Sequence, residues 1–112
     1  MRIYLSHPYG GSKENKKLAR RIAKWHRKTW EHEGRDFELV NPLDDLGGQR
    51  EGNTEDQMLA LAVDLMRSCD MVLFAPGWKK SRGCRYEHYI AYAEGMAYGH
   101  IPDELVPLFT AA

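Results

Sequence analysis

Residues 70–87, DMVLFAPGWKKSRGCRYE, contain the parts from which the fold can be inferred. Residues 70–75, which are apolar after Asp70, predict a strand, which Pro76 and Gly77 end. A polar loop follows, and Ser81 then stands where the N-cap of a helix is expected. A strand, a loop and a helix start in direct succession are typical of α/β proteins.

The same order recurs on both sides of this stretch. Residues 3–6 and 37–40 predict two earlier strands, and residues 105–109 predict a last strand. Pro107 would suit the edge of a sheet better than its centre. We therefore expect a four- to five-stranded parallel sheet with helices on both faces, in a Rossmann-like three-layer sandwich.

Capping residues indicate where the helices begin and end. The first helix is expected after Ser12, with a stop at Gly34, and a second begins after Asn53 or Thr54. A third is expected from Gly83 or Cys84 to about Gly99. In the first helix, the spacing of three and four predicts a buried stripe of Leu18, Ile22, Trp25 and Thr29.

Length and composition limit the classes of protein that remain. The chain has 112 residues, so we expect a single domain over residues 1–112. Its 16 Lys+Arg residues balance its 16 Asp+Glu residues. We expect no signal peptide and no membrane span, and therefore a cytoplasmic protein with reduced thiols. Cys69 and Cys84 belong to no CxxC pair, so a structural zinc site is not expected. The eight cations between residues 13 and 28 are interpreted as a solvated helix face, so nucleic acid is not an expected partner.

Topology selects the segments that would surround a ligand. In open parallel sheets, ligands bind outside the carboxyl ends of the strands. This rule points to residues 6–11, 41–53 and 76–83 and to the tail after Phe109. The candidate binding residues in the first three segments are Ser6, His7, Gly10, Gly11, Asn41, Trp78, Ser81, Arg82 and Gly83.

The start of the third helix predicts an anion site. Backbone N–H groups and the helix dipole point at one spot there, and Ser81 adds a hydroxyl donor. Gly83 would let a ligand approach the backbone, and Glu87 lies about one turn into the helix. The alternative is that Ser81 is only an N-cap and Glu87 a carboxylate that the dipole favours.

Two further residues, Asp64 and Tyr4, are candidates for chemistry. Asp64 lies between Leu61 and Leu65 in an apolar helix. It is either a functional carboxylate near the core or an exposed residue at the rim of the apolar stripe. Tyr4 points to the opposite face of its strand from Ile3 and Leu5. Its phenol could donate a hydrogen bond to a carboxylate in a pocket, or Tyr4 could be an ordinary half-buried strand residue. P-loop, GxGxxG, HExxH and GxSxG motifs are absent, so we expect no metal and no cofactor.

Taken together, these segments resemble the nucleoside 2-deoxyribosyltransferase-like family. The resemblance rests on residues 3–6, Asn41–Pro42, residues 64–70 and residues 76–87, in that order. The nearest branch looks like short, phage-associated members of undefined function, related to nucleoside 5′-monophosphate N-glycosidases. The resemblance implies a flavodoxin-like sheet, and a homodimer or higher homo-oligomer.

The resemblance also implies roles for four residues. Glu87 matches the family's nucleophile, Asp64 its second carboxylate, and Tyr4 the tyrosine that holds the nucleophile. Ser81 stands six residues before Glu87, where the monophosphate hydrolases have a phosphate-binding serine. Those hydrolases also carry an arginine in the turn after the first strand, where this chain has His7, Pro8 and Tyr9. Arg82 or Lys80 is the candidate replacement.

The expected activity is cleavage or transfer at the N-glycosidic bond of a nucleoside or deoxynucleoside 5′-monophosphate. A carboxylate below C1′ can trap an oxocarbenium-like centre, as in retaining glycosidases. The first alternative is a nucleotide-binding or sensing module without catalysis. A second alternative is an NAD-cleaving or cyclic-nucleotide-related activity. Other proteins with such a sheet also cleave a ribosyl bond with a single glutamate that a helix carries.

Overall fold

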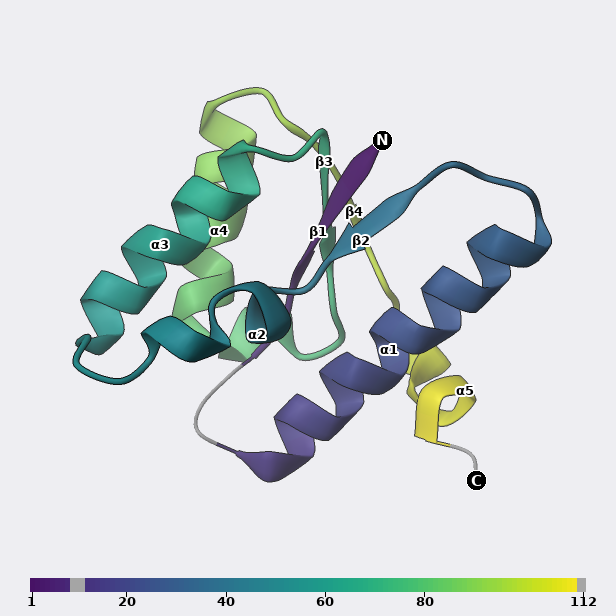
Figure 1. Cartoon of the computed structure of the whole chain (residues 1–112), viewed down its shortest axis with the longest axis horizontal. Coiled ribbons are helices and arrows are strands. Elements are labelled where there is room, and N and C mark those ends of the chain that lie inside the picture. Colours follow the sequence, from purple (N-terminus) through teal and green to yellow (C-terminus); the bar gives the residue numbers. More distant parts are fainter. Residues whose placement is uncertain (9–11, 111–112) are drawn as a thin grey trace.

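The computed structural model describes residues 1–8 and 12–110, and its centre is a four-stranded parallel sheet (Figure 1). The strand order is β2-β1-β3-β4, which places β1 and β3 in the middle. Tyr4 pairs with Val40 on one side and with Val72 on the other. The strands are β1 (Arg2–Ser6), β2 (Glu38–Val40), β3 (Met71–Phe74) and β4 (Ala97–His100).

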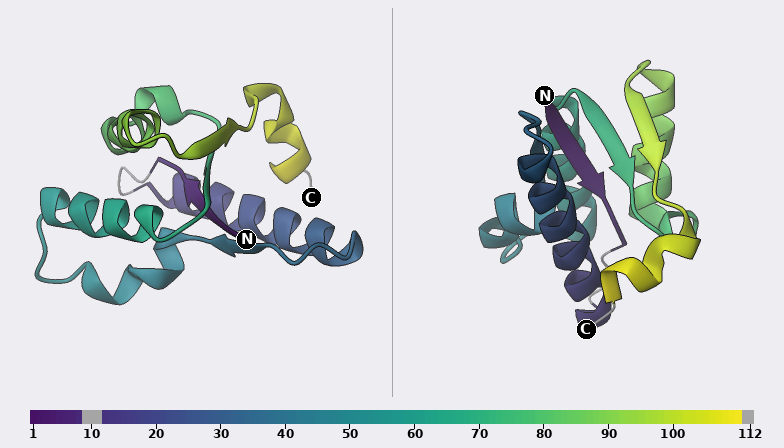
Figure 2. Two further views of the ribbon diagram at one scale, coloured as in Figure 1. Left: turned by 90° about the horizontal axis from the view of Figure 1, so that it is seen from above. Right: turned by 90° about the vertical axis from the view of Figure 1, so that its right-hand side faces the viewer.

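Helices cover both faces of this sheet (Figures 1 and 2). One core cluster joins the sheet to α1 and α5, and a second joins it to α3 and α4. The expected α/β three-layer fold with a parallel sheet is therefore confirmed. The helices are α1 (Lys13–His32), α2 (Pro42–Asp45), α3 (Glu55–Arg67), α4 (Arg82–Ala93) and α5 (Val106–Thr110), with short 3₁₀ turns η1 (Gly47–Gln49), η2 (Trp78–Lys80) and η3 (Asp103–Leu105).

Alternation along β1 decides which side chains face which layer. Ile3 and Leu5 pack into the cluster with α1 and α5, whereas Tyr4 packs into the cluster with α3 and α4. Successive residues of a strand point to opposite faces, so Ser6 lies on the same face as Tyr4. β1 thus presents two hydroxyl groups to the layer that contains α4.

The expected helix caps are present. The Ser12 hydroxyl accepts a hydrogen bond from the Asn15 N–H, and Thr54 forms a capping box with Gln57 at the start of α3. Gly34 follows α1 with a φ of +70°, a left-handed conformation in which glycine is not strained. None of the described helices combines the length and apolar character that crossing a membrane requires.

The C-terminal third of the chain corrects the sequence-based expectation. α4 ends at Ala93, because Gly95 adopts a φ of +71° and stops the helix earlier than Gly99 does. The chain then forms β4 beside β3, so the fourth strand is Ala97–His100 rather than residues 105–109. Residues 105–109 belong to η3 and α5 instead, and Phe109 is buried against the layer of α1.

The buried face of α1 is also shifted from its predicted position. Ala19, Ile22 and Ala23 are the buried residues, whereas Trp25 is 38% exposed at the rim. Trp25 meets Phe109 edge to face, with ring centroids 5.7 Å apart. Two alanines let α1 approach the sheet closely, so the larger side chains on either side pack at its edges.

Candidate active site

A cavity of about 820 Å³ lies at the carboxyl ends of the strands. Its walls come from the turns after β1 and β3, the segment from α2 to the start of α3, one face of α3, and the start of α4. This is the location that the parallel topology predicts. The lining residues include His7, Pro8, Leu46, Arg50, Glu55, Met58, Leu59, Ala62, Lys80, Ser81, Arg82, Gly83, Cys84 and Glu87.

Glu87 is the most constrained carboxylate of this cavity. It is 4% exposed, and its two oxygens accept hydrogen bonds from different residues of β1. The Tyr4 hydroxyl donates to Oε2 at 2.5 Å, and the Ser6 hydroxyl donates to Oε1 at 2.9 Å. β1 therefore fixes the orientation of a side chain that α4 carries, and the carboxylate reaches the cavity in one defined position.

The protonation of Glu87 is balanced near neutral pH. Burial raises the pKa of Glu87 to about 7, while the hydrogen bonds from Tyr4 and Ser6 act in the opposite direction. Burial disfavours the charged form, whereas the two hydroxyl donors favour it. A carboxylate with this pKa can act as a nucleophile or accept a proton at physiological pH.

The start of α4 forms the second part of the site. The Ser81 hydroxyl accepts a hydrogen bond from the Cys84 N–H, so the predicted N-cap is present. Ser81, Arg82 and Gly83 all line the cavity, and Lys80 lies beside them. The first N–H groups of a helix have no partner within the helix, so this end of the cavity favours an anion.

The structure adds detail on the surroundings of two of these residues. Arg82 donates to Asp56 at 2.8 Å, an exposed ion pair that joins the starts of α3 and α4. A methyl group added at Gly83 would meet Leu59 Cδ1 at 3.7 Å, an ordinary contact. Gly83 is thus not required by the local packing.

Asp64 does not reach the cavity. Its side chain is 77% exposed, and its carboxylate lies 3.9 Å from the Arg67 guanidinium. The face of α3 that lines the cavity carries Glu55, Met58, Leu59 and Ala62. Asp64 follows Ala62 by two residues, a rotation of about 200° that turns its side chain to the opposite side of the helix.

Trp78 also lies outside the cavity lining. Its ring stacks on His88 at 4.3 Å and on His100 at 5.1 Å, with Phe74 on the adjoining side. Trp78 therefore packs α4 against the end of the sheet instead of facing a ligand. Gly10 and Gly11, both predicted to bind substrate, lie outside the residues that the structure describes.

His7 and Asn41 form a buried pair at the ends of β1 and β2. Asn41 Oδ1 accepts the Leu43 N–H at 3.1 Å and lies 3.2 Å from His7 Nε2. Because this oxygen is an acceptor, the proton of the shared hydrogen bond belongs to His7. Asn41 is 0% exposed and lies behind the wall, so it positions His7, which does line the cavity.

Sequence reasoning missed several lining residues. Glu55, Met58, Leu59 and Ala62 follow a helical spacing of three and four, which signals a shared face but not that the face borders a cavity. Arg50 lies within residues 41–53, a segment that the topology rule did select, but no motif singles it out. Within residues 1–8 and 12–110, no group of three or more His, Cys, Asp or Glu side chains is placed to hold a metal ion.

Comparison with known proteins identifies the family of the chain. A family model described as "Domain of unknown function (DUF4406)" matches residues 1–98, which include β1, α3, β3 and the whole of α4. The comparisons with curated proteins and with solved structures return no match. The cavity, with Tyr4, Ser6, Ser81 and Glu87, lies within the matched residues. The chain belongs to the DUF4406 domain family.

Proposed function

We propose that this protein cleaves the N-glycosidic bond of a nucleoside or deoxynucleoside 5′-monophosphate, or transfers its sugar to another base. The observation that carries the proposal is the Glu87 carboxylate, which is buried at the cavity and held by two hydroxyl donors. The resemblance to the nucleoside 2-deoxyribosyltransferase-like family supports the same assignment.

In the proposed reaction, Glu87 is the nucleophile. One carboxylate oxygen forms a bond to C1′ while the C1′–N bond breaks, and the electron pair goes to the leaving base. The leaving base takes up a proton from solvent. Water then attacks C1′ and releases the sugar phosphate, or a second base attacks and completes a transfer.

A 5′-phosphate fits the start of α4. Ser81 and the first N–H groups of α4 provide hydrogen-bond donors at one end of the cavity, and Lys80 provides positive charge. Arg82 lies beside them, although Asp56 already pairs with its guanidinium. Glu87 lies one to two turns into the same helix. A ligand held by its phosphate at the helix start would extend its sugar toward the Glu87 carboxylate.

A second candidate function is nucleotide binding without catalysis. The observation that favours it is the position of Asp64, whose exposed side chain cannot act on a leaving base in the cavity. Both candidate functions involve the same nucleotide ligand, but only the N-glycosidase converts it to products. An experiment that measures both binding and product therefore separates them.

The experiment incubates the protein with each of the common nucleoside and deoxynucleoside 5′-monophosphates and detects the free base by chromatography. Glu87→Gln keeps the size of the side chain but removes the nucleophile, so we expect a loss of about 10³-fold or more in base release. Asp64→Asn is the matched control, and we expect it to stay within about twofold of the native protein because its side chain is exposed.

Three outcomes are informative. Release of base by the native protein and Asp64→Asn, but not by Glu87→Gln, supports the N-glycosidase. Equal release by Glu87→Gln excludes Glu87 as nucleophile. A rise in melting temperature with nucleotides, but no free base from any of them, favours the binding module.

A further inference from the structure

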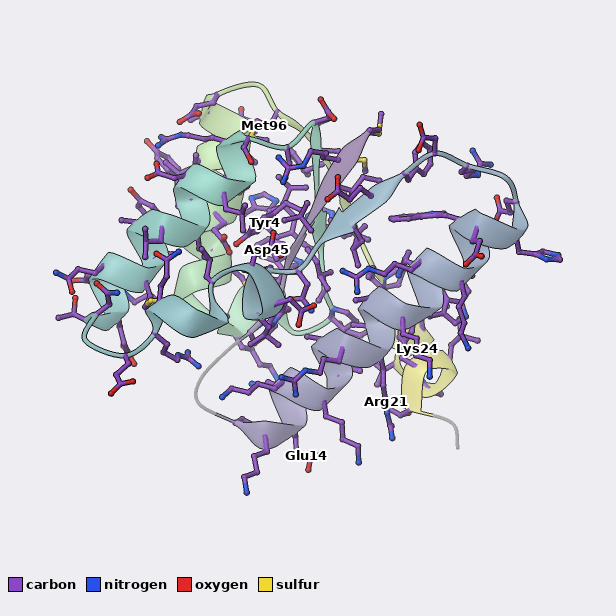
Figure 3. The ribbon with its side chains drawn as sticks, viewed as in Figure 1. Tyr4, Glu14, Arg21, Lys24, Asp45 and Met96 are labelled. Atoms are coloured by element: carbon purple, nitrogen blue, oxygen red, sulfur yellow. The ribbon has the colours of Figure 1, made fainter. Side chains whose placement is uncertain are left out.

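The outer face of α1 carries a concentration of positive charge that the candidate active site does not use. The eight cations between residues 13 and 28 fall on one arc of about 140° around the helix axis. Arg21 and Lys24 project outward from α1 in Figure 3. This basic stripe consists of Lys13, Lys16, Lys17, Arg20, Arg21, Lys24, Arg27 and Lys28.

The basic stripe is not neutralised by the protein itself. None of the ion pairs within residues 1–8 and 12–110 involves a cation of the stripe. Arg27 donates to the Leu39 carbonyl oxygen at 2.9 Å, which leaves its positive charge uncompensated. Six of the side chains surround a shallow hollow of about 440 Å³: Lys13, Lys16, Lys17, Arg20, Arg21 and Lys24.

The arrangement does not serve the stability of α1. Like charges three and four residues apart repel each other by about 0.2–0.5 kcal/mol per pair. The helix dipole favours anions in the first turn, yet Lys13 and Lys16 stand there beside a single acid, Glu14, and His32 alone is basic in the last turn. The charges are therefore placed where they cost stability, which points to a ligand outside the chain.

The dimensions of the stripe fit a nucleic-acid backbone. Residues 13–28 span about 22 Å of helix, and a duplex carries one phosphate per about 1.7 Å of its axis. A membrane surface fits less well, because the apolar face of α1 is buried: Ala19, Ile22 and Ala23 are at most 1% exposed. The stripe consists of Lys and Arg alone, residue types that contact phosphates whatever the base sequence.

We propose that the basic stripe of α1 docks the phosphate backbone of nucleic acid without sequence specificity. This function is independent of the reaction proposed for the cavity. It also revises the expectation from the sequence, in which the same cations were interpreted as a solvated face. Three observations support this revision. The cations lie on one arc of α1, none of the described ion pairs involves them, and Lys13 and Lys16 stand where the helix dipole disfavours positive charge.

The test measures binding of the full chain to a fluorescently labelled 20-base-pair duplex of arbitrary sequence, by anisotropy at several salt concentrations. If six phosphates are contacted, the slope of log K against log salt is about −5, and affinity falls about 10³-fold between 50 and 200 mM salt. Arg20→Gln/Lys24→Gln should make the slope shallower by about 2. Lys79→Gln/Arg85→Gln removes the same two residue types elsewhere and should leave the slope unchanged.

The two double variants leave the cavity lining intact, and glutamine is as good a helix former as lysine. Circular dichroism would verify that both remain folded. The proposal is overturned if the native chain shows no binding to the duplex at 50 mM salt. It is also overturned if both double variants weaken binding equally, or if the chain binds phosphatidylserine vesicles but not the duplex.

Discussion

At the scale of single residues, the two hydroxyl donors on β1 determine how Glu87 behaves. Tyr4 and Ser6 each donate to one carboxylate oxygen, so the side chain cannot rotate without losing a hydrogen bond. Burial nevertheless raises the pKa of Glu87 to about 7. The folded protein thus takes up a proton on this residue more readily than the unfolded chain does.

This raised pKa predicts the pH dependence of stability. Relative to an ordinary pKa of 4.5, a folded-state value of about 7 stabilises the fold below pH 4.5, and that contribution is lost as the pH rises through 7. Replacing Glu87 with Gln removes the cost of the buried charge. The unfolding free energy of Glu87→Gln, relative to native, should rise by on the order of 3 kcal/mol from pH 5 to pH 9.

Urea denaturation of both proteins at the two pH values measures this difference. Asp64→Asn serves as the reference, because it makes a carboxylate-to-amide change at an exposed position. A difference for Glu87→Gln that stays constant with pH would show that Glu87 is not buried as described.

The sequence predicted these residues unevenly. Strand alternation indicated that Tyr4 faces away from Ile3 and Leu5, and the structure confirms this orientation. The hydrogen bond from Ser6 to Glu87 was not predicted, because it depends on how far α4 stands from β1. Asp64 lay close enough to the apolar stripe that only the packing of α3 could show its outward direction.

At the scale of the elements, α4 combines two tasks. Its first turn offers hydrogen-bond donors to the cavity, and its second turn carries Glu87. Ser81 participates in both the fold and the proposed site, because its hydroxyl caps the helix while it lines the cavity. A substitution that keeps the cap but changes the charge would separate these two roles.

Ser81→Asp is that substitution. Aspartate is as good an N-cap as serine, so the melting temperature should remain within about 2 °C of native. Its negative charge would repel a 5′-phosphate, so affinity for a nucleoside 5′-monophosphate should fall at least about tenfold. Calorimetry with the monophosphate and with the corresponding nucleoside tests this, since the nucleoside should bind both proteins equally. Equal weakening for both ligands would contradict a phosphate site at Ser81.

The elements themselves were predictable where the local signals were strong. Caps at Ser12 and Thr54 and the glycine after α1 marked three helix ends correctly. β4 was missed, because Ala97–His100 has no apolar run and its residues are mostly exposed. Its extended conformation depends on pairing with β3, and such long-range pairing is not encoded in its own residues.

At the scale of the whole molecule, the C-terminal segment completes the layer opposite the cavity. The family match ends at residue 98, yet Phe109 is 5% exposed and packs with α1 and the sheet. Leu108, its neighbour, is 50% exposed. Residues beyond the family match therefore contribute to the core of this chain.

Phe109→Ala should lower the free energy of unfolding by about 3–4 kcal/mol, because it removes a buried aromatic side chain and leaves a void. Leu108→Ala changes a similar apolar volume at an exposed position and should cost less than about 1 kcal/mol. Urea denaturation with a common m-value measures both. Similar losses for the two variants would indicate that α5 does not pack against α1 as described.

The walls of the cavity differ in how firmly they are held. Glu87 is tied to β1, an inner strand of the sheet, whereas the facing wall consists of α2 with 4 residues and η1 with 3. Such short helices have few internal hydrogen bonds and open at low free-energy cost. We therefore expect residues 42–53 to open locally while Tyr4, Ser6 and Glu87 stay in register. Access to the cavity and the orientation of the Glu87 carboxylate thus depend on different elements of this fold.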